Sequence, residues 1–167
     1  MKKALLVMDL ENVYVGEEHA PYFQYETHTL LKEANKAIEA NKDNLIIYIR
    51  NLMEKNQENA SAPFHAYEGT REVEFVRELH IVSDHIFVKY ESDAFSNPAL
   101  FQLLKSQEIQ CLELIGIDGG GCVAKTALRA IKEGYEVLLN EKAIGTMFQE
   151  EKEKYWIELA KAGARFV

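Results

Sequence analysis

Residues 112–128 read LELIGIDGGGCVAKTAL, and this stretch decides the fold more than any other part of the chain. Its first part, residues 112–117, is a mainly apolar run with the length of a buried strand. Three glycines follow, and from Cys122 the apolar residues recur at the spacing of a helix that ends near Gly134. The stretch therefore predicts a buried strand, a tight glycine turn and a helix that begins with a cysteine.

The position of Cys122 suggests a reactive thiol. The first turn of a helix presents unpaired N–H groups and the positive end of the helix dipole, and both favour a thiolate over a thiol. Gly119, Gly120 and Gly121 allow the main chain to approach a small ligand closely. A packed core cysteine and a glycine cradle for an anion are the alternatives, so the rest of the chain has to decide.

Strands and helices are predicted to alternate along the whole chain. Apolar runs predict strands at residues 4–8, 45–49, 85–88, 112–117, 135–139 and 164–167. Helical spacing predicts helices at residues 27–40, 97–106, from 122 onwards and 147–162. This alternation predicts an α/β fold: a three-layer α/β/α sandwich with a six-stranded parallel, Rossmann-like sheet, in a single domain over residues 1–167.

Three chemically active side chains follow the carboxyl ends of different predicted strands. Asp9 follows the first strand, Lys89 the third, and the glycine turn before Cys122 the fourth. Ligands of parallel α/β sheets bind at this edge, so an acid, a base and a thiol are predicted to meet there. The polar segment 51–69 lacks periodicity and predicts a long loop, of the kind that often serves as a lid.

Composition argues against several classes of function. The formal charge is −8 over 167 residues, and no Lys/Arg cluster is present, so neither nucleic acid nor a membrane is expected as a partner. The apolar run 4–8 is too short for an export signal or a membrane span, which makes a cytoplasmic location the default expectation. Cys111 and Cys122 are too few for a disulfide framework, and no Cys/His spacing is typical of structural zinc.

Taken together, the motifs resemble those of the isochorismatase-like cysteine hydrolases, the family that includes nicotinamidases and N-carbamoylsarcosine amidohydrolases. Residues 9–12 (DLEN) are similar to the family's Asp-Met-Gln-Asn, and Lys89 with residues 93–95 (DAF) to its Lys followed by Ser-Ala-Phe. Residues 116–127 resemble Gly-Val…Cys-Val-x-x-Thr-Ala, and residues 134–137 (GYEV) resemble Gly-Tyr-x-Val. The order and spacing match over nearly the whole chain.

The resemblance implies a role for each residue of the predicted site. Cys122 would be the nucleophile, Asp9 the acceptor of its proton, and Lys89 the cation that stabilises developing negative charge. The family places a cis peptide at the position of Ile117–Asp118, and an oxyanion hole at the amides of Asp118 and Cys122. Residues implied to contact a small-molecule substrate are Tyr14, Gly119 and Gly121.

The chain also departs from the family pattern. Residues 50–53 (RNLM) lack the Asp-x-His part of the nicotinamidase metal site, so neither a metal nor any other cofactor is expected. Asp118 and Gly119 replace the usual residues of the turn, and Asp93 replaces Ser. A carboxylate at Asp118, if it faced the sulfur, would raise the pKa of the Cys122 thiol and repel anionic substrates.

These observations favour a metal-free cysteine hydrolase that acts on a small amide-like or vinyl-ether-like metabolite, with an amide C–N bond preferred over an isochorismate-type ether bond. The alternative is a non-catalytic binding or interaction protein on the same fold. A nucleotide-binding domain that uses residues 119–121 is a weaker alternative, because these glycines follow the fourth strand and not the first. The family usually associates, so a homo-oligomer is expected, in which the 51–69 loop could complete a neighbour's pocket.

Overall fold

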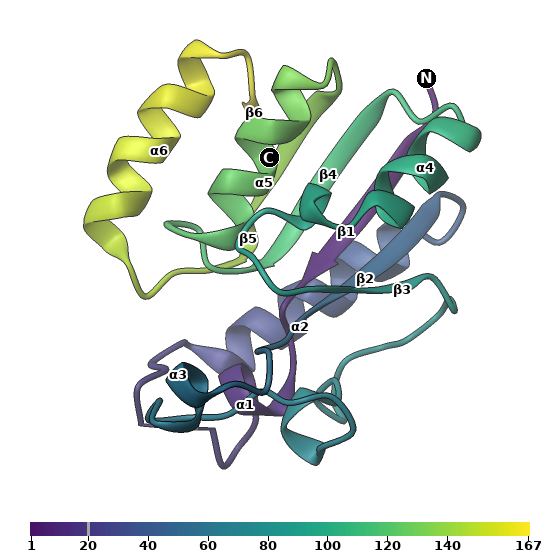
Figure 1. The fold of residues 1–167 in the computed structure, drawn as a ribbon. Coiled ribbons are helices and arrows are strands. Elements are labelled where there is room, and N and C mark those ends of the chain that lie inside the picture. Colours follow the sequence, from purple (N-terminus) through teal and green to yellow (C-terminus); the bar gives the residue numbers. More distant parts are fainter. Residues whose placement is uncertain (20) are drawn as a thin grey trace.

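The computed structural model describes residues 1–19 and 21–167 of the chain. Its centre is a six-stranded parallel sheet with the strand order β3–β2–β1–β4–β5–β6 (Figure 1). The strands are β1 (Lys3–Met8), β2 (Leu45–Asn51), β3 (Ile86–Lys89), β4 (Cys111–Ile117), β5 (Glu136–Gly145) and β6 (Arg165–Phe166). The predicted α/β fold with a parallel six-stranded sheet is confirmed.

Helices cover both faces of this sheet. The α-helices are α1 (Asn12–Val15), α2 (Thr27–Ala40), α3 (Gln57–Ala60), α4 (Pro98–Ser106), α5 (Cys122–Lys132) and α6 (Gln149–Lys161). Two 3-10 turns, η1 (Arg71–Val73) and η2 (Ala94–Ser96), complete the elements. The α2 helix packs on one face, whereas α4, α5 and α6 pack on the other (Figure 1).

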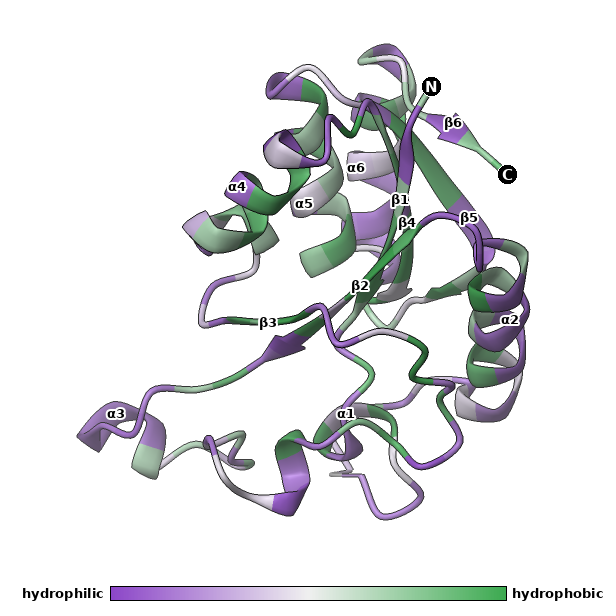
Figure 2. Cartoon of the chain, turned by 90° about the vertical axis from the view of Figure 1, so that its right-hand side faces the viewer, coloured by the Kyte–Doolittle hydropathy of each residue, from purple (hydrophilic) through white to green (hydrophobic). Residues whose placement is uncertain are grey.

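The central strand β1 explains the two layers of helices. Its residues from Ala4 to Met8 are all buried, and successive side chains of a strand point to opposite faces. Leu5 and Val7 belong to the core under α2, while Leu6 and Met8 belong to the core under α4, α5 and α6. Figure 2 shows this hydrophobic centre between helices with polar outer surfaces.

The register of the sheet brings the strand ends to one edge. Met8 of β1 lies opposite Ile49 of β2 and Gly116 of β4. Lys89, the last residue of β3, lies opposite Asn51, the last residue of β2. The residues that follow these positions therefore converge, which is the geometry that a site at the carboxyl edge requires.

Three regions differ from the sequence-based prediction. The β5 strand extends to Gly145, well past residue 139, and its pairing with β4 is interrupted by a register shift between Leu114 and Gly116. The short helix α3 lies in the segment 51–69 predicted as a loop, and the short helix α1 is not among the predicted helices. Within residues 1–19 and 21–167, no helix combines the length and apolar character that a membrane crossing needs.

Candidate active site

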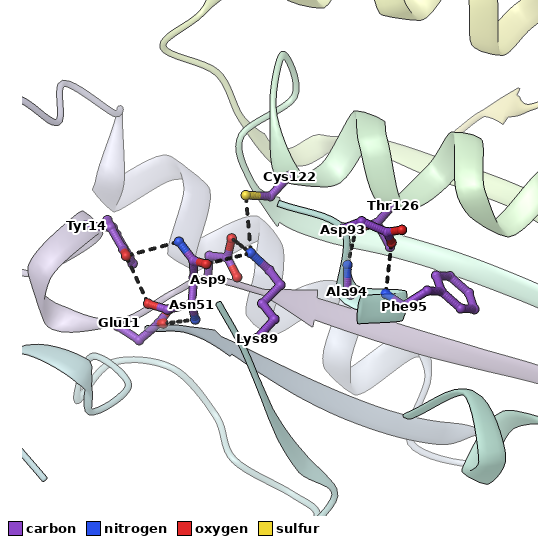
Figure 3. A network of polar contacts seen from close by, with 10 residues as sticks. All are labelled: Asp9, Glu11, Tyr14, Asn51, Lys89, Asp93, Ala94, Phe95, Cys122 and Thr126. Atoms are coloured by element: carbon purple, nitrogen blue, oxygen red, sulfur yellow. Dashed lines mark hydrogen bonds and ion pairs between the residues drawn. The ribbon is translucent and has the colours of Figure 1, made fainter. Parts of the chain in front are cut away.

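Lys89 joins the two other predicted site residues directly. Its Nζ lies 3.0 Å from Oδ2 of Asp9 and 3.3 Å from Sγ of Cys122 (Figure 3). Lys89 and Asp9 are only 1% and 3% exposed, whereas Cys122 is half-buried. The strand ends of β1 and β3 and the start of α5 thus bring an acid, a cation and a thiol into one cluster.

The protonation of this cluster follows from burial and from its three charges. Burial raises the pKa of Asp9, although Lys89 opposes the shift. Burial alone would lower the pKa of Lys89, but Asp9 and Cys122 outweigh it and the pKa is raised. Burial, and then the Asp9 carboxylate, raise the pKa of the Cys122 thiol to about 12, against Lys89.

The raised pKa favours a protonated thiol at Cys122 over the thiolate that the sequence suggests. Burial and the negative charge of Asp9 act on the sulfur more strongly than Lys89 does. The contact between Asp9 and Lys89, together with the raised pKa of the thiol, favours an ion pair beside a protonated Cys122. One oxygen of the Asp9 carboxylate, Oδ1, is buried and has no hydrogen-bond partner in the described part of the chain, so it is available to accept a proton.

Two main-chain N–H groups at the turn before Cys122 donate no hydrogen bond to any group within residues 1–19 and 21–167. The peptide bond Ile117–Asp118 is cis, as the family resemblance predicted. Four amides of the turn donate hydrogen bonds, and these belong to Gly119, Gly120, Gly121 and Val123. The amides of Asp118 and Cys122 remain, and main-chain donors without a partner beside the nucleophile are what an oxyanion hole needs.

The carboxylate of Asp118 is turned towards the loops behind the turn. It accepts hydrogen bonds from the hydroxyl of Tyr25 at 2.9 Å, from the amide of Met147 at 2.6 Å and from the amide of Gly120 at 2.6 Å. The Asp118 carboxylate thus holds three segments together, and its effect on the Cys122 thiol stays a prediction.

The glycines of the turn allow close packing against neighbouring segments as well as close approach of a ligand. A Cβ on Gly119 would lie 2.5 Å from Oγ1 of Thr146, and a Cβ on Gly120 would lie 2.2 Å from the carbonyl oxygen of Phe148. At Gly121 the nearest atom would be 3.5 Å away. Close packing against the β5–α6 connection thus accounts for Gly119, the residue that the sequence suggested as a substrate contact.

Asn51 is the site residue that sequence reasoning missed. Its Oδ1 accepts a hydrogen bond from Lys89 at 3.0 Å, and its Nδ2 donates to the Tyr14 hydroxyl at 3.2 Å. Tyr14 in turn donates to the carbonyl oxygen of Asn51 at 2.9 Å, and its ring packs edge-on against Phe23 and Phe64. A weaker signal was available, since Asn51 lies two residues after the predicted strand 45–49, whereas Asp9 and Lys89 follow their predicted strands directly.

The remaining motif residues have structural roles. Asp93 caps η2 by accepting a hydrogen bond from the amide of Phe95, and it lies 3.8 Å from Arg129. Thr126, buried in α5, accepts a hydrogen bond from the amide of Ala94 (Figure 3). These contacts fix the segment after Lys89 against the helix that carries Cys122.

The donor set of a metal site is not found in the described ranges. No group of three or more His, Cys, Asp or Glu side chains that could hold a metal ion occurs within residues 1–19 and 21–167. Directly after β2 this chain has the buried Leu52 and Met53, and the strand ends in the amide side chain of Asn51, so these positions offer neither a carboxylate nor an imidazole. The residues present do not fit a metal.

A cysteine, an aspartate and a lysine thus meet at the carboxyl edge of a parallel α/β sheet. The model of the isochorismatase domain matches residues 3–167, and the chain belongs to this family, which is hydrolytic. No curated protein sequence matches the chain.

Solved structures with the same fold include three informative relatives. An isochorismatase-like hydrolase from Alkaliphilus metalliredigens is 26% identical, with coverage of 99% of this chain and 93% of the other and a TM-score of 0.85. The pyrazinamidase of Pyrococcus horikoshii, solved in complex with zinc, is 24% identical, with coverage of 100% and 99% and a TM-score of 0.85. N-carbamoylsarcosine amidase from Thermoplasma acidophilum is 24% identical, with coverage of 99% and 95% and a TM-score of 0.82.

Proposed function

We propose that this protein is a metal-free cysteine hydrolase that cleaves an amide C–N bond of a small metabolite. The observation that carries the proposal is the Lys89 ammonium, which contacts both the Asp9 carboxylate and the Cys122 sulfur. Solved relatives described as a pyrazinamidase and an N-carbamoylsarcosine amidase support an amide over a vinyl ether.

The first half of the reaction forms a thioester. Sγ of Cys122 attacks the carbonyl carbon of the amide while its proton passes to Oδ1 of Asp9. The carbonyl oxygen gains the negative charge and is stabilised by the amides of Asp118 and Cys122. Asp9 then gives the proton to the leaving nitrogen, and ammonia or an amine departs as the carbonyl re-forms.

The second half returns the protein to its resting state. A water molecule loses a proton to Asp9 and attacks the thioester carbon, and the carboxylic acid is released as the C–S bond breaks. The proton on Asp9 restores the Cys122 thiol. Lys89 remains charged throughout, since it balances Asp9 at rest and the developing thiolate during attack.

The substrate contacts suggested by this arrangement are few. Tyr14 lies next to the cluster and is held by Asn51, and Gly121, next to the nucleophile in sequence, is the turn glycine whose Cβ position is least crowded. Because the Lys89 ammonium is already paired with Asp9, the cluster has little charge to offer an anionic group. We therefore propose a small, uncharged amide or carbamoyl group as the part of the substrate that is cleaved.

Ammonia release from a panel of small primary amides and N-carbamoyl compounds tests this function. The panel is run with the wild-type protein and with Cys122→Ala and Cys111→Ala, the second being a matched control because Cys111 lies at the opposite end of β4. Release that requires Cys122 and not Cys111 supports the hydrolase. Binding of panel compounds without any release, by folded wild-type protein, supports a non-catalytic binding protein on this fold.

A further inference from the structure

Glu11 is a second buried carboxyl group beside the proposed catalytic cluster. It is 0% exposed and lies two residues after Asp9, between the end of β1 and the start of α1. Its Oε1 accepts a hydrogen bond from the main-chain amide of Asn51 (Figure 3). Its Oε2 is buried and has no hydrogen-bond partner in residues 1–19 and 21–167. The mechanism above does not use this group.

The charges around Glu11 favour a neutral side chain. The Asp9 carboxylate faces it from the end of β1, the Lys89 ammonium from β3 and the Tyr14 phenol from α1. Lys89 forms its ion pair with Asp9, and Arg50 of β2 makes no ion pair with Glu11 in the described residues. Glu74, whose carbonyl oxygen accepts from the amide of Asn12, has an exposed side chain. Two buried carboxyl groups thus lie near one ammonium, and the ammonium pairs with Asp9.

The pKa of Glu11 agrees with this arrangement of two carboxyl groups and one ammonium. Burial raises the pKa of Glu11 well above its usual value, and the Asp9 charge raises it further, against the Asn51 amide and Lys89. An unpaired buried carboxylate is far more costly than a buried neutral acid. The family motif that residues 9–12 resemble has Gln at this position, an uncharged side chain of nearly the same shape.

Glu11 is also connected to the catalytic lysine. The amide of Asn51 donates to Glu11, and the side chain of the same Asn51 accepts from Nζ of Lys89. A change at Glu11 that moves Asn51 therefore moves an acceptor of the Lys89 ammonium. A negative charge on Glu11 would in addition compete with Asp9 and Cys122 for that ammonium.

On the basis of the proposed function, we propose that Glu11 is a positioning residue that works as a neutral acid. It holds Asn51, and through it Lys89, and the loss of its proton as the pH rises weakens the hold of Lys89 on Cys122. Glu11 itself transfers no proton to or from the substrate. Its ionisation sets the alkaline limit of the activity.

Four proteins test this role: wild type, Glu11→Gln, Glu11→Ala and the exposed control Glu74→Gln. Thermal melts establish that each is folded. The rate of alkylation of Cys122 by iodoacetamide is followed from pH 5 to pH 10 by mass spectrometry of the Cys122 peptide, which needs no substrate. Ammonia release from the best amide of the panel is measured over the same range.

We expect Glu11→Gln to match wild type near pH 5 and to be alkylated severalfold faster than wild type at the alkaline end. Its hydrolase activity should extend to higher pH, while Glu74→Gln follows wild type. Glu11→Ala, which cannot hold Asn51, should lose activity by about tenfold to a hundredfold through misplacement of Lys89.

Two results would overturn the inference. Alkylation curves of wild type and Glu11→Gln that superimpose at every pH would show that Glu11 does not ionise next to Cys122. A folded Glu11→Gln protein that is inactive at every pH would show that the carboxylate itself is required. If no compound is hydrolysed but the alkylation curves diverge as expected, the proposed function fails while the role of Glu11 towards Cys122 holds.

Discussion

Lys89 is the residue on which the site depends most. An ammonium group has three N–H donors, and here they face Oδ2 of Asp9, Oδ1 of Asn51 and Sγ of Cys122. A buried charge of this kind is tolerated only where it is paired and hydrogen-bonded. The three contacts orient the ammonium and hold together residues that come from separate strand ends.

The carboxylate of Asp118 gives a prediction about stability. Asp118→Ala leaves the Tyr25 hydroxyl and two main-chain amides without an acceptor, and we expect it to lower the free energy of unfolding by about 2–4 kcal/mol. Tyr25→Phe removes one of the three contacts and should cost about 1 kcal/mol. Urea denaturation measures both changes. Equal stability of Asp118→Ala and wild type would contradict the conclusion that the Asp118 carboxylate holds three segments together.

Glu11 gives a prediction about pH. Its pKa in the folded protein lies above the ordinary value of 4.5, so the folded state holds the proton more tightly than the unfolded state does. Its contribution to stability is fully present below that ordinary value and is lost as pH rises through the folded pKa. Glu11→Gln has no such loss. Unfolding free energies at several pH values should therefore show the variant gaining on wild type as pH rises, and a constant difference would count against a raised pKa.

At the scale of elements, the nucleophile turn is packed against the start of α6. A Cβ on Gly120 would meet main-chain atoms of Phe148 and Lys152, which cannot move without shifting that helix. We expect Gly120→Ala to destabilise the protein by about 1–3 kcal/mol, as overpacking does. Gly134→Ala, at a φ of 93° with no atom near its Cβ, is the control and carries only backbone strain. Thermal denaturation compares the two variants. A larger loss of stability in Gly134→Ala than in Gly120→Ala would show that the turn shifts to make room for the added Cβ, against the prediction.

Much of the element pattern was predictable because the central strands are buried on both faces. β1 and β4 contain runs in which nearly every residue is apolar, and such runs are readable without knowledge of their neighbours. The second half of β5 was not predictable, because Glu141 and Lys142 are polar and exposed beside a register shift. The four residues of α1 are too few to show a helical period.

The three residues of the candidate cluster were predictable from the sequence, but their contacts and protonation were not. Asp9, Lys89 and Cys122 follow strands, and parallel strand ends meet at one edge. The contact between Asn51 and Lys89 depends on the register of β2 with β3, which is a long-range property. The protonation of Cys122 depends on burial and on Asp9, neither of which its place at the start of a helix reveals.

At the scale of the whole molecule, one edge of the sheet suggests self-association. β3 is an edge strand, and Ile81, Val82 and Ile86 on and before it are exposed. We predict a homo-oligomer at micromolar concentration, in which this apolar edge is covered. Light scattering coupled to size exclusion measures the mass directly. A mass equal to the 19.1 kDa of one chain at all concentrations would reject the prediction.

The central claim is that Asp9 and Lys89 control the proton of Cys122. Asp9→Asn removes the negative charge that opposes ionisation of the thiol, and the Lys89 ammonium then has the sulfur as its counter-ion. The variant should therefore lose hydrolase activity, since the base is gone, while its thiol becomes more reactive.

The most direct measurement is the iodoacetamide alkylation rate of Cys122 in wild type and Asp9→Asn across pH, on protein shown to be folded by its thermal melt. We predict slow alkylation of wild type at neutral pH. In Asp9→Asn the rate there should rise by about tenfold for each unit by which the thiol pKa falls. Wild-type Cys122 that reacts like a free thiol, with a rate that Asp9→Asn leaves unchanged or lowers, would contradict the account.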